Sequence, residues 1–152
     1  MSIQSSEILN NKYLEVLIEK TIYGIDISSV VEILRYKEIN YVHGQPDYIE
    51  GSIIFREKAI PVFNLRKRFS LETKEVDDNT CIIALDVQGK SVGFIVDGVA
   101  DIVEIKPNEI TEIEEFNVSI SNQFIVGISI SEKQVVILDS QKILSYREIG
   151  EI

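Results

Sequence analysis

Short apolar segments alternate with polar turns along most of the chain, without a long helical period. Between Tyr13 and Glu19, apolar residues occupy every second position, which is typical of a half-buried β-strand. Residues 81–87 (CIIALDV) are almost continuously apolar, as expected of a strand covered on both faces. Strands at this short spacing, separated by turn residues, predict an all-β sandwich or barrel.

The pattern predicts strands over residues 13–18, 22–27, 52–55, 59–63, 81–87, 91–96, 102–105, 124–130 and 134–138. Pro61 cannot donate to a sheet ladder, so its strand should lie at an edge or bulge at that point. We expect a helical turn over residues 47–50, a short helix opening at Asn64 and a C-terminal helix over about 140–148.

The two halves of the chain resemble each other. Residues 23–33 (YGIDISSVVEI) are similar to 92–105 (VGFIVDGVADIVEI), and residues 48–65 are similar to 124–140. An internal repeat of this kind predicts two small five-stranded barrels, because closure of a barrel removes exposed strand edges. Each half alone buries little core, so the two should pack together and leave a groove between them.

The repeat separates structural residues from candidate functional ones. Gly51 matches Gly127 and Asn64 matches Asp139, which indicates a shared backbone requirement and a shared helix N-cap. Arg56, at the tip of the hairpin after Gly51, has no counterpart in the second half. Because the hairpin forms there without arginine, Arg56 is the better candidate for contact with a partner protein, where arginine is enriched.

The domain organisation follows from the same pattern. We expect a loose N-terminal tail over residues 1–12 and one domain over residues 13–152. The polar segment 70–79 is the best linker candidate, so the first subdomain should cover about 13–72 and the second about 78–140.

Composition limits the class of partner. The net charge of −10 disfavours nucleic acid and anionic membranes. The single cysteine excludes an internal disulfide and favours the reducing cytoplasm, and we find no signal peptide or membrane-spanning run. We expect no metal or cofactor, because His43 lacks neighbouring ligands, Cys81 opens an apolar strand and no phosphate-binding loop is present.

A basic cluster is the remaining charged feature. Arg66, Lys67 and Arg68 form either a solvated helix face or, together with Arg56, a surface for a partner protein. Exposed apolar residues such as Val30 and Ile33 could complete that surface.

Five stretches together resemble the CheW family, the coupling proteins of bacterial chemotaxis, in the order of that family: YGIDISSVVEI (23–33), GSIIFREKAIPVFNLRKRF (51–69), VGFIVDGVADIVEI (92–105), FIVGISI (124–130) and VVILDSQKIL (135–144). The resemblance implies two five-stranded, SH3-like β-barrel subdomains and an adaptor without catalytic activity. It also implies two partners, namely the regulatory domain of the histidine kinase CheA and the cytoplasmic hairpin tip of methyl-accepting chemoreceptors. The protein would then be cytoplasmic and recruited to receptor arrays at the membrane, without inserting into it.

The resemblance also assigns residues. Arg56 matches a position important for receptor coupling, and Val30, Glu32 and Gly51 match positions of receptor or kinase contact. Val99 and Ile102 would line the groove from the second subdomain.

The chain departs from the family pattern at three positions, with Ile54 for asparagine, Glu57 for glycine and Asn64 for aspartate. Glu57 should change the shape of the hairpin tip and place a carboxylate that competes for Arg56. Two alternatives remain open: a divergent CheW-like scaffold for another receptor and kinase pathway, and a small β-barrel enzyme or ligand-binding protein.

Overall fold

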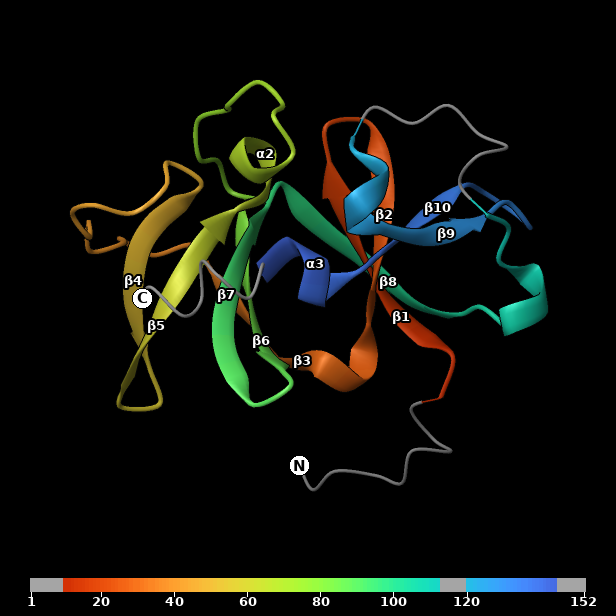
Figure 1. Cartoon of the computed structure of the whole chain (residues 1–152), viewed down its shortest axis with the longest axis horizontal. Helices are drawn as coiled ribbons and strands as arrows, with labels where there is room; N and C mark the ends of the chain where they lie inside the picture. The colour runs from red at the N-terminus through yellow and green to blue at the C-terminus, as the bar shows by residue number, and fades with distance from the viewer. Residues whose placement is uncertain (1–9, 113–119, 145–152) are drawn as a thin grey trace.

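The structure, a computed structural model, describes residues 10–112 and 120–144 (Figure 1). Within these ranges the chain forms ten strands: β1 (Lys12–Ile18), β2 (Thr21–Asp26), β3 (Val30–Arg35), β4 (Ile49–Phe55), β5 (Lys58–Asn64), β6 (Cys81–Val87), β7 (Lys90–Val96), β8 (Gly98–Glu104), β9 (Ile125–Ser129) and β10 (Val135–Leu138). The helices are short: η1 (Ile27–Ser29), α2 (Leu65–Arg68), η2 (Pro107–Glu109), η4 (Asn122–Phe124) and α3 (Ser140–Leu144). The predicted tail over residues 1–9 and the helix beyond Leu144 lie outside the described residues.

The strands form two five-stranded sheets, as the all-β prediction requires. One sheet has the order β8-β1-β2-β10-β9 and the other has the order β3-β6-β7-β5-β4. The sheets lie side by side, with the short helices at their ends and between them (Figure 1).

The sheets do not divide the chain at the acidic segment 70–79, so the expected subdomain boundaries are wrong. The hairpin β1–β2 joins the sheet of β8, β9 and β10, and the hairpin β6–β7 joins the sheet of β3, β4 and β5. Each half of the sequence therefore supplies two strands to one sheet and three strands to the other. The internal repeat itself is confirmed, because the two sheet orders are identical when each strand of one half is replaced by its counterpart in the other.

The register of the repeat differs from the alignment of 30–33 with 102–105 made on sequence. Ile33 pairs with Ile83 of β6, and Ile102 pairs with Leu14 of β1 in the same way. Ile33 and Ile102 are therefore structural equivalents. The two strands also share a bulge, which interrupts β3 between Val30 and Glu32 and the β1–β8 pairing between Leu14 and Val16.

Each sheet is closed by a backbone bridge to one edge strand from the segment that follows the opposite edge strand, β3 or β8. Asn40 bridges to Ser52 at the edge strand β4, and Thr111 bridges to Ile128 at the edge strand β9. Glycine precedes both bridges because the chains approach closely there. A Cβ atom on Gly51 would lie 2.0 Å from the carbonyl oxygen of Asn40, and one on Gly127 would lie 2.5 Å from Ile110.

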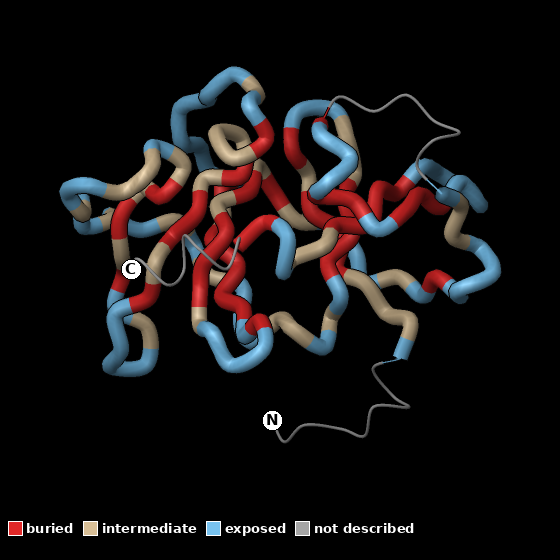
Figure 2. Tube along the Cα trace, in the orientation of Figure 1, coloured by how far each residue is buried: buried red, intermediate tan, exposed pale blue. Residues whose placement is uncertain are grey.

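Buried residues follow the strands of both sheets (Figure 2), and their side chains form three clusters. The largest lies between the sheets and includes Tyr23, Phe63, Phe94 and Phe124. A smaller cluster around Ile53 fills one barrel, and another around Val135 fills the other: Ile53, Ile60, Val62 and Ile82 in the first, and Ile105, Val135 and Ile137 in the second. Burial of this continuous apolar surface joins the sheets into one unit.

Two local predictions have different outcomes. Pro61 pairs with Ser52 of β4, and β5 pairs with β7 only from Val62 onward, so the missing N–H falls where β5 has one neighbour, as predicted. The turn expected over residues 47–50 is limited to Asp47 and Tyr48, where the Ile49 amide donates to the carbonyl oxygen of Pro46, because β4 already begins at Ile49.

Candidate protein-binding site

The β4–β5 hairpin ends in a two-residue turn formed by Arg56 and Glu57. Both residues have positive φ, 51° and 66° respectively, and Phe55 pairs directly with Lys58. This is the geometry of a type I′ turn, which matches the twist of the strands. Glu57 therefore adopts the left-handed conformation that glycine favours, at a cost in backbone strain. The predicted change in the shape of the tip stays a prediction.

Arg56 is exposed and makes an ion pair with Glu32 of β3. The distance from Nη2 to Oε1 is 3.2 Å, and the two side chains are 65% and 47% exposed. The guanidinium also lies 5.0 Å from the centre of the Phe55 ring. An ion pair this exposed adds at most about 1 kcal/mol to stability, so both groups are available to a partner.

Exposed apolar side chains lie beside this pair in the sequence. Ile33 follows Glu32 on β3 and is 45% exposed, and Ile54 precedes the tip on β4 and is 56% exposed. Sequence analysis noted Ile54 only as a departure from a pattern and missed it as a surface residue. We call Glu32, Ile33, Ile54, Arg56 and Glu57 the tip surface. Arginine beside apolar residues is typical of protein interfaces.

Four other candidates lie elsewhere. Gly51 is buried, so its requirement is the close approach to Asn40 rather than a contact at the surface. Val30 and Val99 are half-buried and pack against the central core. Ile102 is 57% exposed on β8, in the other sheet, as the equivalent of Ile33.

The basic cluster serves the fold, so both interpretations made on sequence are wrong. Arg66 is 14% exposed and bonds Asp97, with Nη2 2.6 Å from Oδ2, while its Nη1 donates to the carbonyl oxygen of Glu72. Lys67 lies 3.0 Å from Glu50. These contacts attach α2 to the loop that follows it, to the turn between β7 and β8 and to β4.

Arg68 links the two sheets. Its guanidinium lies 4.3 Å from the centre of the Tyr48 ring and 4.8 Å from that of Phe124, and its Nε donates to the carbonyl oxygen of Ile143. Burial lowers the pKa of Arg68, but its ordinary value is high enough for the group to stay charged.

Asp97 and Cys81 also have shifted pKa values with clear causes. Burial tends to raise the pKa of Asp97, but hydrogen bonds from Arg66 and from the Glu19 amide outweigh it and lower the pKa below its usual range. Partial burial raises the pKa of the Cys81 thiol, which keeps it protonated and weakly nucleophilic at neutral pH.

Comparison with known families identifies the fold. The family model described as CheW-like domain matches residues 12–148. The chain belongs to the CheW-like domain family. The two five-stranded barrels, each completed by a hairpin from the other half of the chain, are thus the two SH3-like subdomains of a CheW-like domain.

Relatives of the CheW-like chain are similar over most of their length. The chain is 32% identical over 129 residues to "Chemotaxis protein CheW" of Klebsiella aerogenes, and the match covers 84% of this chain and 78% of the relative. It is 28% identical over 136 residues to the protein of the same name from Treponema pallidum, covering 86% and 80%. The crystal structure of scaffolding protein TtCheW from Thermoanaerobacter tengcongensis superposes with a TM-score of 0.81 at 28% identity, covering 91% of this chain and 90% of that one.

Helices of this CheW-like domain are short. Within residues 10–112 and 120–144, we find no helix with the length and apolar character needed to cross a membrane.

Proposed function

We propose that this chain is a chemotaxis coupling adaptor that binds the cytoplasmic tip of a chemoreceptor and the regulatory domain of the histidine kinase CheA at the same time. It acts in the cytoplasm, at receptor arrays on the membrane, and it catalyses no reaction. Membership of the CheW-like family supports this proposal, as do the names of its relatives, which describe a chemotaxis protein and a scaffolding protein.

The exposed pair Arg56–Glu32 is the observation that carries the proposal to particular residues. Glu32 lies on the strand β3 and Arg56 lies in the tight turn between β4 and β5. Both side chains are exposed enough to contact a partner. Because the pair adds little to stability, an acidic group of the receptor can exchange with Glu32 as the partner of Arg56 at small cost. Ile33, Ile54 and, from the other sheet, Ile102 add apolar area to the receptor contact.

The mechanism is thermodynamic coupling between two bound proteins. If receptor and kinase each bind one conformation of the complex better, binding of one shifts the affinity for the other by the same factor. An adaptor needs no reactive group for this effect, since differential affinity alone transmits the receptor state to the kinase.

A charge reversal at Arg56 tests the receptor contact. We expect Arg56→Glu to weaken binding of a receptor cytoplasmic fragment about 30-fold, because it removes an interface arginine and repels acidic partners. The affinity for the CheA regulatory domain and the melting temperature should change little, because the side chain is 65% exposed. Isothermal titration with each partner alone measures both affinities.

Lys90→Glu is the matched control, because it makes the same charge change at the exposed first residue of β7, beside the β6–β7 turn. Equal weakening by Lys90→Glu would mean that net charge, rather than the tip surface, controls receptor binding. A large loss of melting temperature in Arg56→Glu would make Arg56 a structural residue.

The tip surface also favours a second candidate, a divergent scaffold that serves a different receptor set. Exposed Ile54 and the carboxylate of Glu57 replace the asparagine and glycine of the family pattern beside Arg56. Binding to a kinase other than CheA, with no measurable affinity for CheA, would establish this alternative.

A further inference from the structure

A buried carboxylate lies in the other barrel, away from the tip surface. Glu15 of β1 is fully buried and is the only charged residue classed as buried in the part of the chain that the structure describes. Its Oε1 lies 3.1 Å from Nζ of Lys133 and accepts a long 3.4 Å bond from the Asp101 amide. Its Oε2 lies 3.0 Å from the same Nζ, but among the described residues it accepts no hydrogen bond.

The repeat shows that the barrel does not need this carboxylate. Glu15 pairs with Gly24 across β1 and β2, and Ala84 pairs with Gly93 at the equivalent point across β6 and β7. The second sheet thus forms with alanine where the first has a buried charge. Removing a carboxylate from water is costly, and replacement by an apolar residue is often neutral or stabilising. Stability therefore does not explain Glu15.

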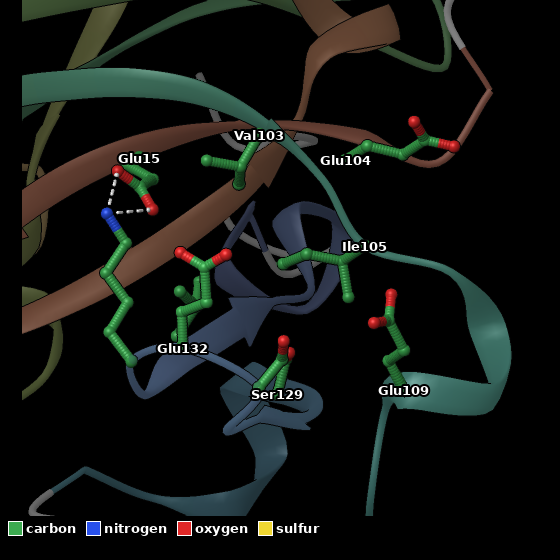
Figure 3. A pocket seen from close by; sticks show the side chains of 10 residues that line it. Glu15, Val103, Glu104, Ile105, Glu109, Ser129 and Glu132 are labelled. Carbon is green, nitrogen blue, oxygen red and sulfur yellow. Dashed lines mark hydrogen bonds and ion pairs between the residues drawn. The ribbon is translucent and has the colours of Figure 1, made fainter.

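Glu15 faces a small cavity at the end of the β9–β10 hairpin (Figure 3). Four carboxylates and one ammonium line it: Glu15, Glu104, Glu109, Glu132 and Lys133. Val103 and Val135 add apolar wall. The cavity volume is about 280 Å3, below the roughly 300–1,000 Å3 of sites for drug-sized ligands. A single side chain or a small organic ion fits this size, and the excess of carboxylates favours a cation.

We infer that this cavity binds an aliphatic ammonium group, with Glu15 as its counter-ion. In the free protein the Nζ of Lys133 occupies the place beside Glu15, 3.1 Å and 3.0 Å from its two carboxylate oxygens. The dashed lines at Glu15 in Figure 3 mark these contacts. The Lys133 side chain is 45% exposed and comes from the loop between β9 and β10, so it can leave without disturbing a strand. An incoming ammonium then contacts Glu15 and Glu132, while its alkyl stem lies on the apolar wall. The inference does not depend on the proposed function.

Nuclear magnetic resonance titration of the full chain tests the site. The probe is n-butylammonium chloride, with n-butanol as the neutral control and sodium chloride at matched ionic strength. We expect a saturable shift of the Asp101 amide, which donates to Glu15, with the ammonium only. Lys133→Met removes the competing charge and keeps the stem. It should bind at least about tenfold more tightly, because the competent state is no longer occupied internally.

Two further variants keep the test decisive. Glu15→Gln should abolish the shift, and Glu132→Gln, on the exposed hairpin loop, should weaken binding about threefold even if Glu15→Gln does not fold. Glu75→Gln makes the same charge change in the exposed acidic loop and should have no effect. The inference is overturned if Lys133→Met shows no saturable shift with n-butylammonium. It is also overturned if Lys133→Met and the double variant Lys133→Met/Glu132→Gln bind n-butylammonium with equal affinity.

The source of the ammonium is resolved by a second probe, the capped tripeptide acetyl-Gly-Lys-Gly-amide. Binding of both probes identifies a pocket for a lysine side chain of a docking protein, and binding of n-butylammonium alone identifies a site for a free amine. Binding of neither probe overturns the inference.

Discussion

Arginines that look alike in the sequence have opposite environments at the residue scale. Arg56 is 65% exposed beside one carboxylate, whereas Arg66 is 14% exposed and makes a two-nitrogen contact with Asp97. The difference arises from position, because Arg56 projects from a hairpin tip while α2 directs Arg66 toward the turns at the ends of β1 and β7. Sequence alone shows the charge of each residue but not the partner that the fold brings to it.

Backbone strain at the tip predicts that Glu57→Gly stabilises the protein. Glu57 has φ of 66°, which costs a non-glycine residue roughly 1 to 2 kcal/mol, partly offset because glycine makes the unfolded chain more flexible. We expect the free energy of unfolding to rise by about 0.5 to 1 kcal/mol, measured by urea denaturation. Glu57→Ala is the control, because it removes the same charge but keeps the strain. An equal gain in both variants would assign the effect to charge.

Asp97 predicts a dependence of stability on pH. The pKa of Asp97 is lowered in the folded protein, so its contribution is fully present above its unfolded pKa of about 3.9 and is lost as pH falls through the folded value. Asp97→Asn should therefore cost about 2 kcal/mol at pH 7 and much less near pH 2. Urea denaturation of both proteins across this range measures the difference. A loss independent of pH would show that the carboxylate charge is not what Arg66 requires.

At the element scale, apolar patterns predict nine of the ten strands in the described residues, including the continuously apolar Cys81–Val87, but they miss β3. They do not reveal which strands pair. The chain crosses from one sheet to the other between β2 and β3, through η1. The Asp26 carboxylate caps η1 by accepting a hydrogen bond from the Ser28 amide. Nothing in the sequence around η1 marks this change of sheet. Arg56 was predictable as a contact residue, because the second half of the repeat has no arginine at the equivalent position. Its ion pair with Glu32 was not, because β3 and the β4–β5 hairpin meet only when the sheet closes.

Closure of the sheet at Asn40 predicts a severe effect of Gly51→Ala. The added Cβ would lie 2.0 Å from a backbone oxygen, and φ of 151° is unfavourable for alanine as well. We expect a loss of about 3 kcal/mol or more in the free energy of unfolding. Gly44→Ala is the control, because φ is 85° there and nothing lies within 4 Å of the new atom. It should cost about 1 kcal/mol. Equal losses would mean that φ strain alone explains Gly51.

Exchange of hairpins makes the whole molecule interdependent. Without β6 and β7, the strand β3 has no neighbour in its sheet, and without β1 and β2 the strand β8 has none. The central core also draws residues from both halves, such as Tyr23 and Phe124, which each contact Phe69. The sequence repeat is therefore not a pair of independent folding units, although each half contains one full set of five strands.

Fragments cut within the acidic loop test this interdependence. We expect fragments 1–75 and 76–152 each to lack a stable monomeric fold, and an equimolar mixture to regain the dispersed nuclear magnetic resonance spectrum of the intact chain. The reason is that each sheet needs a hairpin from the other half, and burial of the shared core supplies most of the driving force for association.

The intact chain nicked at the same point is the control and should remain folded, because the loop is exposed there. A fragment that folds alone as a monomer would contradict hairpin exchange, whereas a fragment that folds only as a dimer would extend it, since two copies of one half can supply equivalent hairpins to each other.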